Sequence, residues 1–329
     1  EGGSSVTVPE STLLRRDGRT WRISCAAEGA DSAAPAATSA TTLTTSHPDG
    51  RPRDRPRYAG STVRDDVWLE AVAQALTEID AGDYDKVVLA RDLHLWARGA
   101  FPVDRLLSDL VARFPSCTTF LVDGLIGASP ETLIERRGTR IRSRVLAGTA
   151  RRDPDPEVDA QLGADLLASD KDRREHDLAL RSAVDALAPL CTTLEVPDGP
   201  SLVQLDNVQH LGSDLVGELR SSVDGDVPHV LDLVERLHPT AAVGGAPREA
   251  ALDAIGRLEG MSRGRYAGPV GWFDAAGDGE FAIALRCAEV RGDRARLFAG
   301  AGIVAGSLPE AELTETWLKL QAMTGILDG

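Results

Sequence analysis

Apolar and polar residues along this chain repeat with the periods of both helices and strands. Residues 67–80 carry apolar side chains three and four positions apart, which predicts an amphipathic helix. Residues 84–97 alternate with a period of two, which predicts a strand with Lys86 and Val88 on the same face. Patterns of these two kinds continue to the end of the chain.

The remaining elements follow from the same periods and from the turn and cap residues between them. Helices are predicted at residues 103–114, 169–190, 227–237 and 244–258, with a polar linker before the second of them. Strands are predicted at residues 118–123, 140–145, 266–273, 281–290 and 294–298, and as a pair within 202–219 that is separated by 209–211. Hairpins interrupted by single long helices indicate an α+β fold with large, mostly antiparallel sheets, not a doubly wound parallel sheet.

The C-terminal part of the chain combines a hairpin, a glycine-rich stretch and a helix. The turn of the hairpin is predicted at residues 292–293, and residues 299–304 are predicted to form a bend. Gly300 and Gly302 leave backbone N–H groups open to close approach, which suits an anionic ligand. Ser307 is a suitable N-cap for the helix that follows.

This last helix has two faces of different character. An apolar stripe contains Leu313, Trp317 and Leu320. A polar stripe lies roughly 130° away, at about 100° per residue, and contains Glu312, Glu315 and Lys319. The polar stripe has two interpretations. It is either a solvated face with a Glu–Lys pair, or a set of charges that lines a polar pocket together with the glycines.

Other charged positions also have an ordinary and a functional interpretation. Lys86 stands at the start of its strand, where lysine is typical of an edge or a solvent-facing position. Glu131 follows small residues and a proline in a tight bend that either presents the carboxylate or is an ordinary turn. Asp172 and Glu175, near the start of the helix at 169–190, fit the helix dipole and require no ligand for that.

Composition and charge limit the classes of function. The chain has 329 residues, 42% hydrophobic and 26% charged, as in ordinary globular proteins, and no apolar run reaches the roughly 18 residues of a membrane span. Its net charge of −15 argues against nucleic acid or an anionic membrane as a partner. The four cysteines have no CxxC spacing and are expected to be buried thiols in a reducing compartment.

The residue types available as metal ligands favour magnesium. The chain has six histidines and no HExxH motif, whereas carboxylates are abundant. Carboxylate oxygens are ligands that Mg²⁺ prefers. The chain has neither a GxGxxG after a first strand nor a GxxxxGK[ST] motif, so the sequence gives a nucleotide site no support.

Several segments, taken together and in order, resemble one enzyme family. They are residues 86–91 (KVVLAR), 127–131 (GASPE), 146–149 (LAGT), 172–176 (DRREH), 237–240 (LHPT), 263–272 (RGRYAGPVGW), 283–286 (IALR), 299–304 (AGAGIV) and 312–316 (ELTET) with Lys319. The chain resembles the chorismate-utilising enzymes of menaquinone, siderophore and tryptophan synthesis, and among them isochorismate synthases most closely. The resemblance covers residue 65 to the end, and the coincidence of all these motifs makes it specific.

The resemblance implies an α+β domain with two sheets packed face to face, helices outside and the active site between them. Residues 65–329 are expected to form this chorismate-binding catalytic domain. Residues 1–64 are expected to be partly loop or poorly ordered and to contribute to the same domain, since residues 31–60 are rich in Ala, Ser, Thr, Pro and Arg. The cofactor that the resemblance implies is Mg²⁺.

The resemblance also implies roles for single residues through the motifs that contain them. Lys86 is the expected general base and Glu131 the expected general acid. Glu175 and Glu315 are expected to hold the Mg²⁺, with Glu312 nearby. The expected substrate-binding residues are Gly148, Thr149, His210, His238, Thr240, Tyr266, Arg286, Gly300, Ala301, Gly302 and Lys319.

The chemistry of chorismate makes physical sense of these roles. Adding water at C2 while the C4 hydroxyl leaves requires a proton to be removed on one side of the ring and another to be donated on the other side. Lys86 must be neutral to accept a proton, which desolvation and nearby cations favour. Glu131 must be protonated to donate one, which an apolar or anionic setting favours.

Two positions separate the reactions within the family. Amine-transferring members typically lack a lysine at the position of Lys86, and aminodeoxychorismate synthases typically carry one where this chain has Ala147. Water is therefore the expected nucleophile and isochorismate the expected product. The alternatives are a salicylate synthase, which also eliminates pyruvate, then an amine-transferring 2-amino-2-deoxyisochorismate synthase, and last a chorismate-binding protein without turnover. The expected protein is a cytoplasmic monomer without a glutamine amidotransferase subunit, a nucleic-acid partner or a membrane partner.

Overall fold

The computed structural model describes residues 5–9, 11–16, 19–24, 55–222 and 225–328, and every structural statement below refers to these residues. The chain divides into two compact units, Glu1–Arg51 and Pro52–Gly329. In the first unit, strand β1 (Ser11–Arg16) pairs antiparallel with β2 (Arg19–Ser24). Most of the loop predicted at residues 31–60 lies outside the described residues, but its last part forms strand β3 (Arg57–Gly60).

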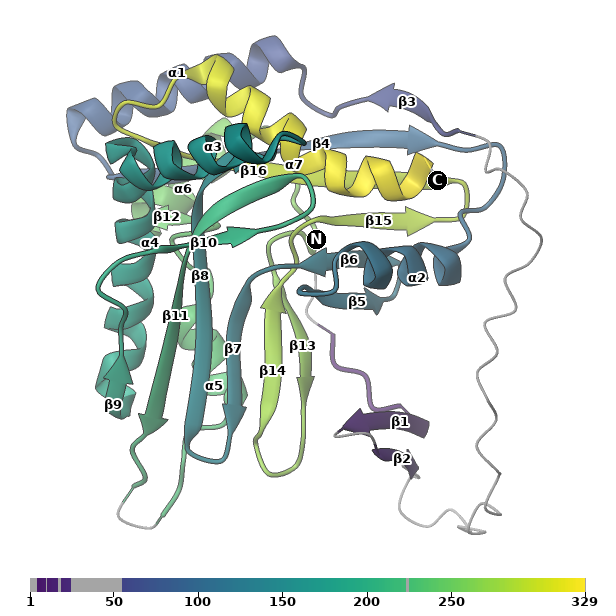
Figure 1. Ribbon diagram of the computed structural model, residues 1–329, viewed down its shortest axis with the longest axis vertical. Coiled ribbons are helices and arrows are strands. Elements are labelled where there is room, and N and C mark those ends of the chain that lie inside the picture. Colours follow the sequence, from purple (N-terminus) through teal and green to yellow (C-terminus); the bar gives the residue numbers. More distant parts are fainter. Residues whose placement is uncertain (1–4, 10, 17–18, 25–54, 223–224, 329) are drawn as a thin grey trace. The chain divides into compact units, whose positions relative to one another are not determined.

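The second unit contains two seven-stranded sheets in which every pairing is antiparallel (Figure 1). The strands of sheet 1 run in the order β12 (Gly245–Ala246), β4 (Lys86–Trp96), β16 (Arg294–Val304), β15 (Cys287–Arg291), β6 (Leu125–Ser129) and β5 (Thr118–Val122), with β3 also on β4. The strands of sheet 2 run in the order β10 (Ser201–Gln204), β11 (Val208–Leu219), β8 (Arg140–Arg151), β7 (Thr132–Arg137), β14 (Gly279–Ile283) and β13 (Pro269–Phe273), with β9 (Cys191–Glu195) also on β11. The predicted α+β fold with antiparallel sheets is confirmed.

Seven α-helices accompany these sheets in the described part of the chain. They are α1 (Asp65–Ala81), α2 (Val103–Arg113), α3 (Pro156–Ala168), α4 (Asp170–Leu187), α5 (Val230–Leu237), α6 (Arg248–Leu258) and α7 (Pro309–Asp328). The start of α4 is as predicted, because the Ser169 side chain accepts a hydrogen bond from the Asp172 amide. The polar linker predicted before it is wrong: α3 occupies that stretch, with Asp155 as its N-cap and Pro156 as its first residue. Within the described ranges, no helix has the length and apolar content needed to cross a bilayer.

Three apolar clusters hold the second unit together. In the largest, side chains of sheet 2 such as Ile134 and Leu215 pack with Ala90 and Phe298 of sheet 1, so the two sheets share one core. A second cluster packs α2 and α7 against sheet 1, and a third packs α1 and α6 against β4 and β16. Figure 1 shows α1 and α7 over sheet 1, and α4 beside β11 of sheet 2.

Two predictions for the C-terminal part of the chain are wrong in detail. The strand predicted at 281–290 is two strands in different sheets, β14 and β15, and the chain crosses between them at residues 284–286. Arg286 lies in this crossing with a φ of 47°, in the left-handed region. The bend predicted at residues 299–304 is a regular part of β16, paired with β4 as far as Val304. The crossing takes Arg286 out of sheet 2, while its carbonyl accepts a hydrogen bond from the Ala128 amide of β6 in sheet 1.

A buried ion pair fixes the edge of sheet 1 next to α6. Arg263 Nη2 lies 2.5 Å from Glu259 Oε2 and also donates to the Val88 carbonyl, while Arg263 Nη1 donates to the Val243 carbonyl. Glu259 Oε2 in turn accepts from the Ala90 amide at 2.8 Å. Since Glu259 is 2% exposed, each of these groups depends on the others to offset the cost of burial.

We expect Glu259→Ala to lower the free energy of unfolding by about 3–5 kcal/mol, because it leaves the Arg263 guanidinium buried without its carboxylate and the Ala90 amide without an acceptor. Urea denaturation followed by circular dichroism measures the change. Glu70→Ala, which removes an exposed carboxylate from α1, is the matched control and should change it by less than about 0.5 kcal/mol. A loss for Glu259→Ala as small as that of the control would contradict this account.

Candidate active site

A cavity lies between the two sheets, where β4 and β16 of sheet 1 face β8 and β11 of sheet 2. It is lined by Val88, Pro130, Glu131, Leu146, Ala147, Gly148, Thr149, Glu175, His210, Ala242, Val243, Arg263, Tyr266, Ala267, Leu285, Arg286, Phe298, Ala299, Gly300, Gly302 and Lys319. Acidic side chains, basic side chains and the backbone of glycines therefore face the same space. Tyr266 stacks on Phe298 in one wall, with ring centroids 5.1 Å apart.

Backbone groups of β16 point into this space. Val88 and Ala90 donate their amides to acceptors on the side of β4 that faces away from β16. Two residues that face each other in an antiparallel ladder direct their N–H and C=O groups either both toward the partner strand or both away from it. Because Val88 and Ala90 direct theirs away from β16, Gly302 and Gly300, which face them, direct theirs away from β4. On that side the neighbouring strand β15 pairs only as far as Leu297. The amides of Gly300 and Gly302 are therefore open, as expected, but they lie along the edge of a strand and not in a bend.

At Gly302 a side chain of helix α4 comes close to this strand. A Cβ atom at this position would lie 2.1 Å from Glu175 Oε1 and 3.0 Å from Lys86 Cε. Any other residue would displace both charged groups. Lys86 is fully buried, and its Nζ lies 3.2 Å from Glu175 Oε1. The solvent-facing interpretation of Lys86 is therefore wrong.

A β-bulge in sheet 2 shapes the opposite wall. The register between β8 and β11 changes at His210, which faces Thr149, while Leu211 faces Ala147. Gly148 has no partner in the ladder and adopts a φ of 79°, which a residue with a side chain rarely adopts. Residues 209–211 and 146–149 thus lie inside long strands. They were expected between two strands and at a strand end, respectively.

A network of hydrogen bonds starts at Arg286 and runs along the cavity wall. Arg286 Nη2 lies 2.8 Å from His210 Nε2, and because a guanidinium is only a donor, Nε2 must accept. His210 Nδ1 then carries the proton and can donate to the Gly148 carbonyl or to Thr149 Oγ1, both 3.1 Å away. Burial and the charge of Arg286 hold the pKa of His210 well below its usual value, which keeps this imidazole neutral.

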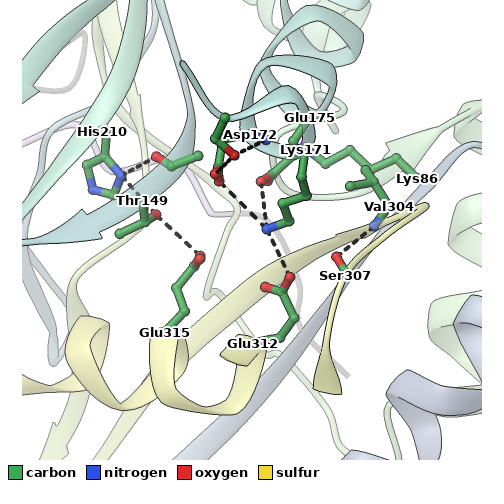
Figure 2. A network of polar contacts seen from close by, with 12 residues as sticks. Lys86, Thr149, Lys171, Asp172, Glu175, His210, Val304, Ser307, Glu312 and Glu315 are labelled. Carbon is green, nitrogen blue, oxygen red and sulfur yellow. Dashed lines mark hydrogen bonds and ion pairs between the residues drawn. The ribbon is translucent and has the colours of Figure 1, made fainter. Parts of the chain in front are cut away.

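This network of hydrogen bonds continues from Thr149 to the last helix. Thr149 Oγ1 donates to Glu315 Oε1 at 3.3 Å (Figure 2). The same Glu315 oxygen lies 2.5 Å from Lys319 Nζ. Lys319 Nζ also donates to the Gly300 carbonyl at 2.8 Å. Burial raises the pKa of Glu315, but Lys319 and Lys171 lower it by more, so Glu315 is ionised. The polar stripe of α7 thus lines the site, whereas Trp317 of the apolar stripe is 37% exposed.

Glu131 is the acid of the cavity that is most removed from water. It follows β6 and Pro130, and its backbone carbonyl accepts from the Ile283 amide. Burial raises the pKa of Glu131 to about 8, against the opposing influence of Lys86. Glu131 is therefore protonated at neutral pH and can donate a proton into the cavity.

A cluster of carboxylates surrounds the ammonium of Lys171, which lies in the first turn of α4 (Figure 2). Lys171 Nζ lies 2.9 Å from Glu312 Oε1, 3.7 Å from Asp172 Oδ1 and 3.8 Å from Glu175 Oε2. Burial alone would lower the pKa of Lys171, but these carboxylates and Glu315 raise it. Burial and the neighbouring Glu315 raise the pKa of Glu312 to about 7.

Comparison with known proteins shows the family of this chain. A family model described as chorismate binding enzyme matches residues 2–328, nearly the whole chain. The chain belongs to the chorismate binding enzyme family. The resemblance found from the motifs is thereby confirmed.

Relatives of this chorismate binding enzyme include isochorismate synthases from bacteria. The isochorismate synthase MenF of Bacillus subtilis is 41% identical over 287 residues, which cover 86% of this chain and 60% of that protein. The isochorismate synthase DhbC of the same organism is 43% identical over 267 residues, 78% of this chain and 66% of that protein. The structure of MenF, the menaquinone-specific isochorismate synthase from Escherichia coli, matches with a TM-score of 0.74 at 32% identity, over 85% of this chain and 65% of that one. The chain thus spans about two thirds or less of the length of these relatives.

Not every expected site residue of this family member lines the cavity. Glu131, Gly148, Thr149, Glu175, His210, Tyr266, Arg286, Gly300, Gly302 and Lys319 do. The expected residues that lie outside the lining are Lys86, His238, Thr240, Ala301, Glu312 and Glu315.

Those outside the lining differ in how close to it they are. Lys86 contacts the lining residue Glu175, and Glu315 contacts the lining residue Lys319. Glu312 belongs to the cluster of carboxylates around Lys171. Ala301 packs in the apolar cluster under α1 and α6. His238 and Thr240 precede the lining residues Ala242 and Val243, and His238 Nδ1 and Thr240 Oγ1 are buried without a hydrogen-bond partner in the described residues.

Lys171 is the residue of the site that the sequence analysis missed, although a signal for it exists. Of the 36 lysines and arginines in the chain, only Lys86, Lys171 and Lys319 are lysines. The basic surface positions of this protein are therefore arginines. All three lysines lie around the cavity, so the lysine count would have directed attention to Lys171.

The carboxylates around Lys171 can also be tested as a site for Mg²⁺. In the described ranges, no three acidic, imidazole or thiol side chains converge as a ready-made metal site. Glu175 Oε2 is nevertheless buried without a hydrogen-bond partner, and its neighbours Glu312 and Asp172 offer oxygen atoms to a cation that is already present, the Lys171 ammonium. Oxygen donors grouped around positive charge fit a hard divalent ion.

Proposed function

We propose that this chorismate binding enzyme is an isochorismate synthase, which converts chorismate reversibly to isochorismate by attack of water at C2 and loss of the C4 hydroxyl. The observation that carries the proposal is the pairing of a fully buried lysine, Lys86, with a buried acid that keeps its proton at neutral pH, Glu131. These are the two groups of opposite role that the exchange of a hydroxyl requires. The names of the relatives support the same reaction.

Several groups of the cavity suit a dianionic substrate in a protein with a net charge of −15. Arg286 and Lys319 supply fixed positive charge, and the outward amides of Gly300 and Gly302 supply donors without side chains in the way. His210 stays neutral, and its hydrogen bond to Arg286 fixes the guanidinium. We assign the substrate carboxylates to these groups, with Tyr266 against the ring.

The reaction itself needs two proton transfers by residues of this chain. As the base, Lys86 takes a proton from the water that attacks C2. The ring double bonds shift, the C4–O bond breaks, and Glu131 donates its proton to the leaving hydroxyl, which departs as water. The reverse reaction exchanges the two roles, as microscopic reversibility requires.

We assign the Mg²⁺ of this reaction to Glu175 and Glu315, with Glu312 nearby. The orphaned Glu175 oxygen and the ionised state of Glu315 support the assignment. When bound, such an ion offsets the charge of a substrate carboxylate and orients the ring.

Water is favoured over ammonia as the nucleophile. Lys86 is buried beside the cavity, and Ala147 leaves the wall free of a second lysine there. We therefore propose that the enzyme acts without a glutamine amidotransferase subunit, as a monomer in the cytoplasm. Its product suits both quinone and siderophore routes, since relatives of both kinds carry the name isochorismate synthase.

Incubation with chorismate, with and without Mg²⁺, tests the proposal, with products separated by chromatography and identified by mass. We expect a Mg²⁺-dependent product of unchanged mass that comes to equilibrium with chorismate. Salicylate together with pyruvate would replace the proposal by a salicylate synthase. Turnover that requires ammonium would replace it by an amine-transferring enzyme, and absence of turnover by a chorismate-binding protein.

A further inference from the structure

Lys171 is a charged group of the site to which the proposed reaction gives no role. It is the second residue of α4, and its side chain remains 24% exposed. Its Nζ makes its shortest contact, 2.9 Å, with Glu312, whose side chain is 2% exposed. The ammonium therefore holds a nearly buried carboxylate on α7 against α4.

The other carboxylates around this ammonium are incompletely satisfied. Glu175 faces Lys86 through Oε1, but its Oε2 is buried and has no hydrogen-bond partner in the described residues. At 3.8 Å from Lys171 Nζ, this oxygen gains only a charge interaction. Asp172 Oδ1 lies 3.7 Å from Lys171 Nζ, while Asp172 Oδ2 accepts a hydrogen bond from the Ser169 hydroxyl. One monovalent group thus stands among three carboxylates and makes close contact with one.

We propose that Lys171 is a resident counter-cation, which lies among Asp172, Glu175 and Glu312 until a divalent ion that binds Glu175 and the neighbouring Glu315 displaces it. The inference rests on the proposed function only in taking Mg²⁺ as that ion. Lys171 acts here as a positioning residue, because it keeps the carboxylates together without touching the reacting atoms.

Displacement follows from size and charge. A Mg²⁺ ion needs its oxygen ligands at about 2.0–2.1 Å, and an ammonium that contacts the same oxygens prevents that approach. The two cations also repel each other at short range. The flexible four-carbon stem of Lys171 and its partial exposure give the ammonium a route to solvent.

Two consequences separate this role from a purely structural one. Without the Lys171 charge, the metal-free protein must hold three carboxylates together with no cation among them, so it becomes less stable. The same change removes the competitor of the divalent ion, so the ion binds more tightly. A residue that only packed between the helices would lower stability without improving metal binding.

The test compares Lys171→Met, which keeps the length of the side chain but removes its charge, with Lys171→Arg and Arg173→Met. Arg173 lies in the same helical turn on the exposed face, so its variant controls for loss of one positive charge. Each protein is freed of metal with a chelator and titrated calorimetrically with MgCl₂ in the absence of chorismate. We expect Lys171→Met to bind Mg²⁺ about tenfold more tightly or better, and to melt at a lower temperature when metal-free. Arg173→Met should match the wild type, and Lys171→Arg should not gain affinity.

The wild-type protein provides a second measurement that does not depend on folding of a variant. Because the chain has three lysines, a sample labelled with ¹³C at the lysine ε position gives three side-chain resonances, assigned by substitution. We expect the Lys171 resonance to move towards the position of a solvated lysine as Mg²⁺ saturates the protein. A resonance that stays in place at saturation, unchanged or weaker Mg²⁺ binding by Lys171→Met, or lack of Mg²⁺ binding by both proteins would each overturn the inference.

These outcomes are separate from the fate of the proposed function. Product analysis with chorismate decides the reaction, whereas calorimetry and resonance shifts use no substrate. A protein that forms no isochorismate but shows the expected Mg²⁺ competition would lose the proposed function and keep this inference.

Discussion

Lys86→Ala should abolish the addition of water to chorismate while chorismate still binds. If Lys86 is the base, its loss removes the acceptor for the proton of the attacking water, a contribution of roughly 10²–10⁴ in kcat. Because Lys86 is fully buried, a group exposed to solvent cannot take its place as proton acceptor. Formation of isochorismate measures kcat, and calorimetric titration in the presence of Mg²⁺ measures binding.

A second variant separates the chemistry of Lys86 from its packing. Lys86→Met fills most of the same volume but cannot accept a proton, so it should lose turnover to the same extent as Lys86→Ala. Both variants also leave Glu175 without its partner at 3.2 Å, which is expected to change Mg²⁺ binding. Near-normal turnover in either variant would remove Lys86 from the role of base.

The regular elements of this protein could largely be predicted from the sequence. Helix α4 begins where Ser169 was expected to cap it, and α2 begins at Val103 as predicted. Strand β4 starts at Lys86, within the period-2 stretch at 84–97. These elements were predictable because a local pattern and a cap coincide with the final packing.

Elements whose form depends on distant partners were not predictable in the same way. The stretch 299–304 is rich in glycine and was expected to bend, but pairing with β4 along its whole length keeps it a strand. The run 281–290 has a uniform strand composition, and only the existence of two sheets explains why it breaks before Arg286. The helix α3 was missed because its first residues are mostly polar and are preceded by the polar stretch at residues 152–155.

The candidate site shows the same division. The motifs indicated which residues would gather, and ten of the expected residues line one cavity. The α7 stripe of Glu312 and Glu315 could not be assigned from its spacing, since an i,i+4 pair with Lys319 is equally common on solvated faces. Glu312 is buried against Lys171 of α4, which lies far away in the sequence. Lys171 lies at a helix start, where charged residues are ordinary, so the sequence assigned it no function.

Glu131→Gln should lower kcat by roughly 10²–10⁴ with little change in KM, because the amide keeps the shape of the side chain but has no acidic proton to give to the leaving hydroxyl. Initial rates over a range of chorismate concentrations measure both constants. Glu135→Gln, on the next strand β7 and only half-buried, is the matched control and should behave as the wild type. A change confined to KM would instead assign Glu131 to substrate binding.

The pH dependence gives the sharper test of the same residue. Burial raises the pKa of Glu131 to about 8, so the protonated form that donates is present at neutral pH and is lost as the pH rises above about 8. The wild-type kcat should therefore fall on the alkaline side of this value. In Glu131→Gln the side chain cannot ionise, so this alkaline limb should be absent from its low residual rate. A limb that persists unchanged in the variant would belong to another group, and Glu131 would then not be the acid, because no ionisation of residue 131 would remain to produce it.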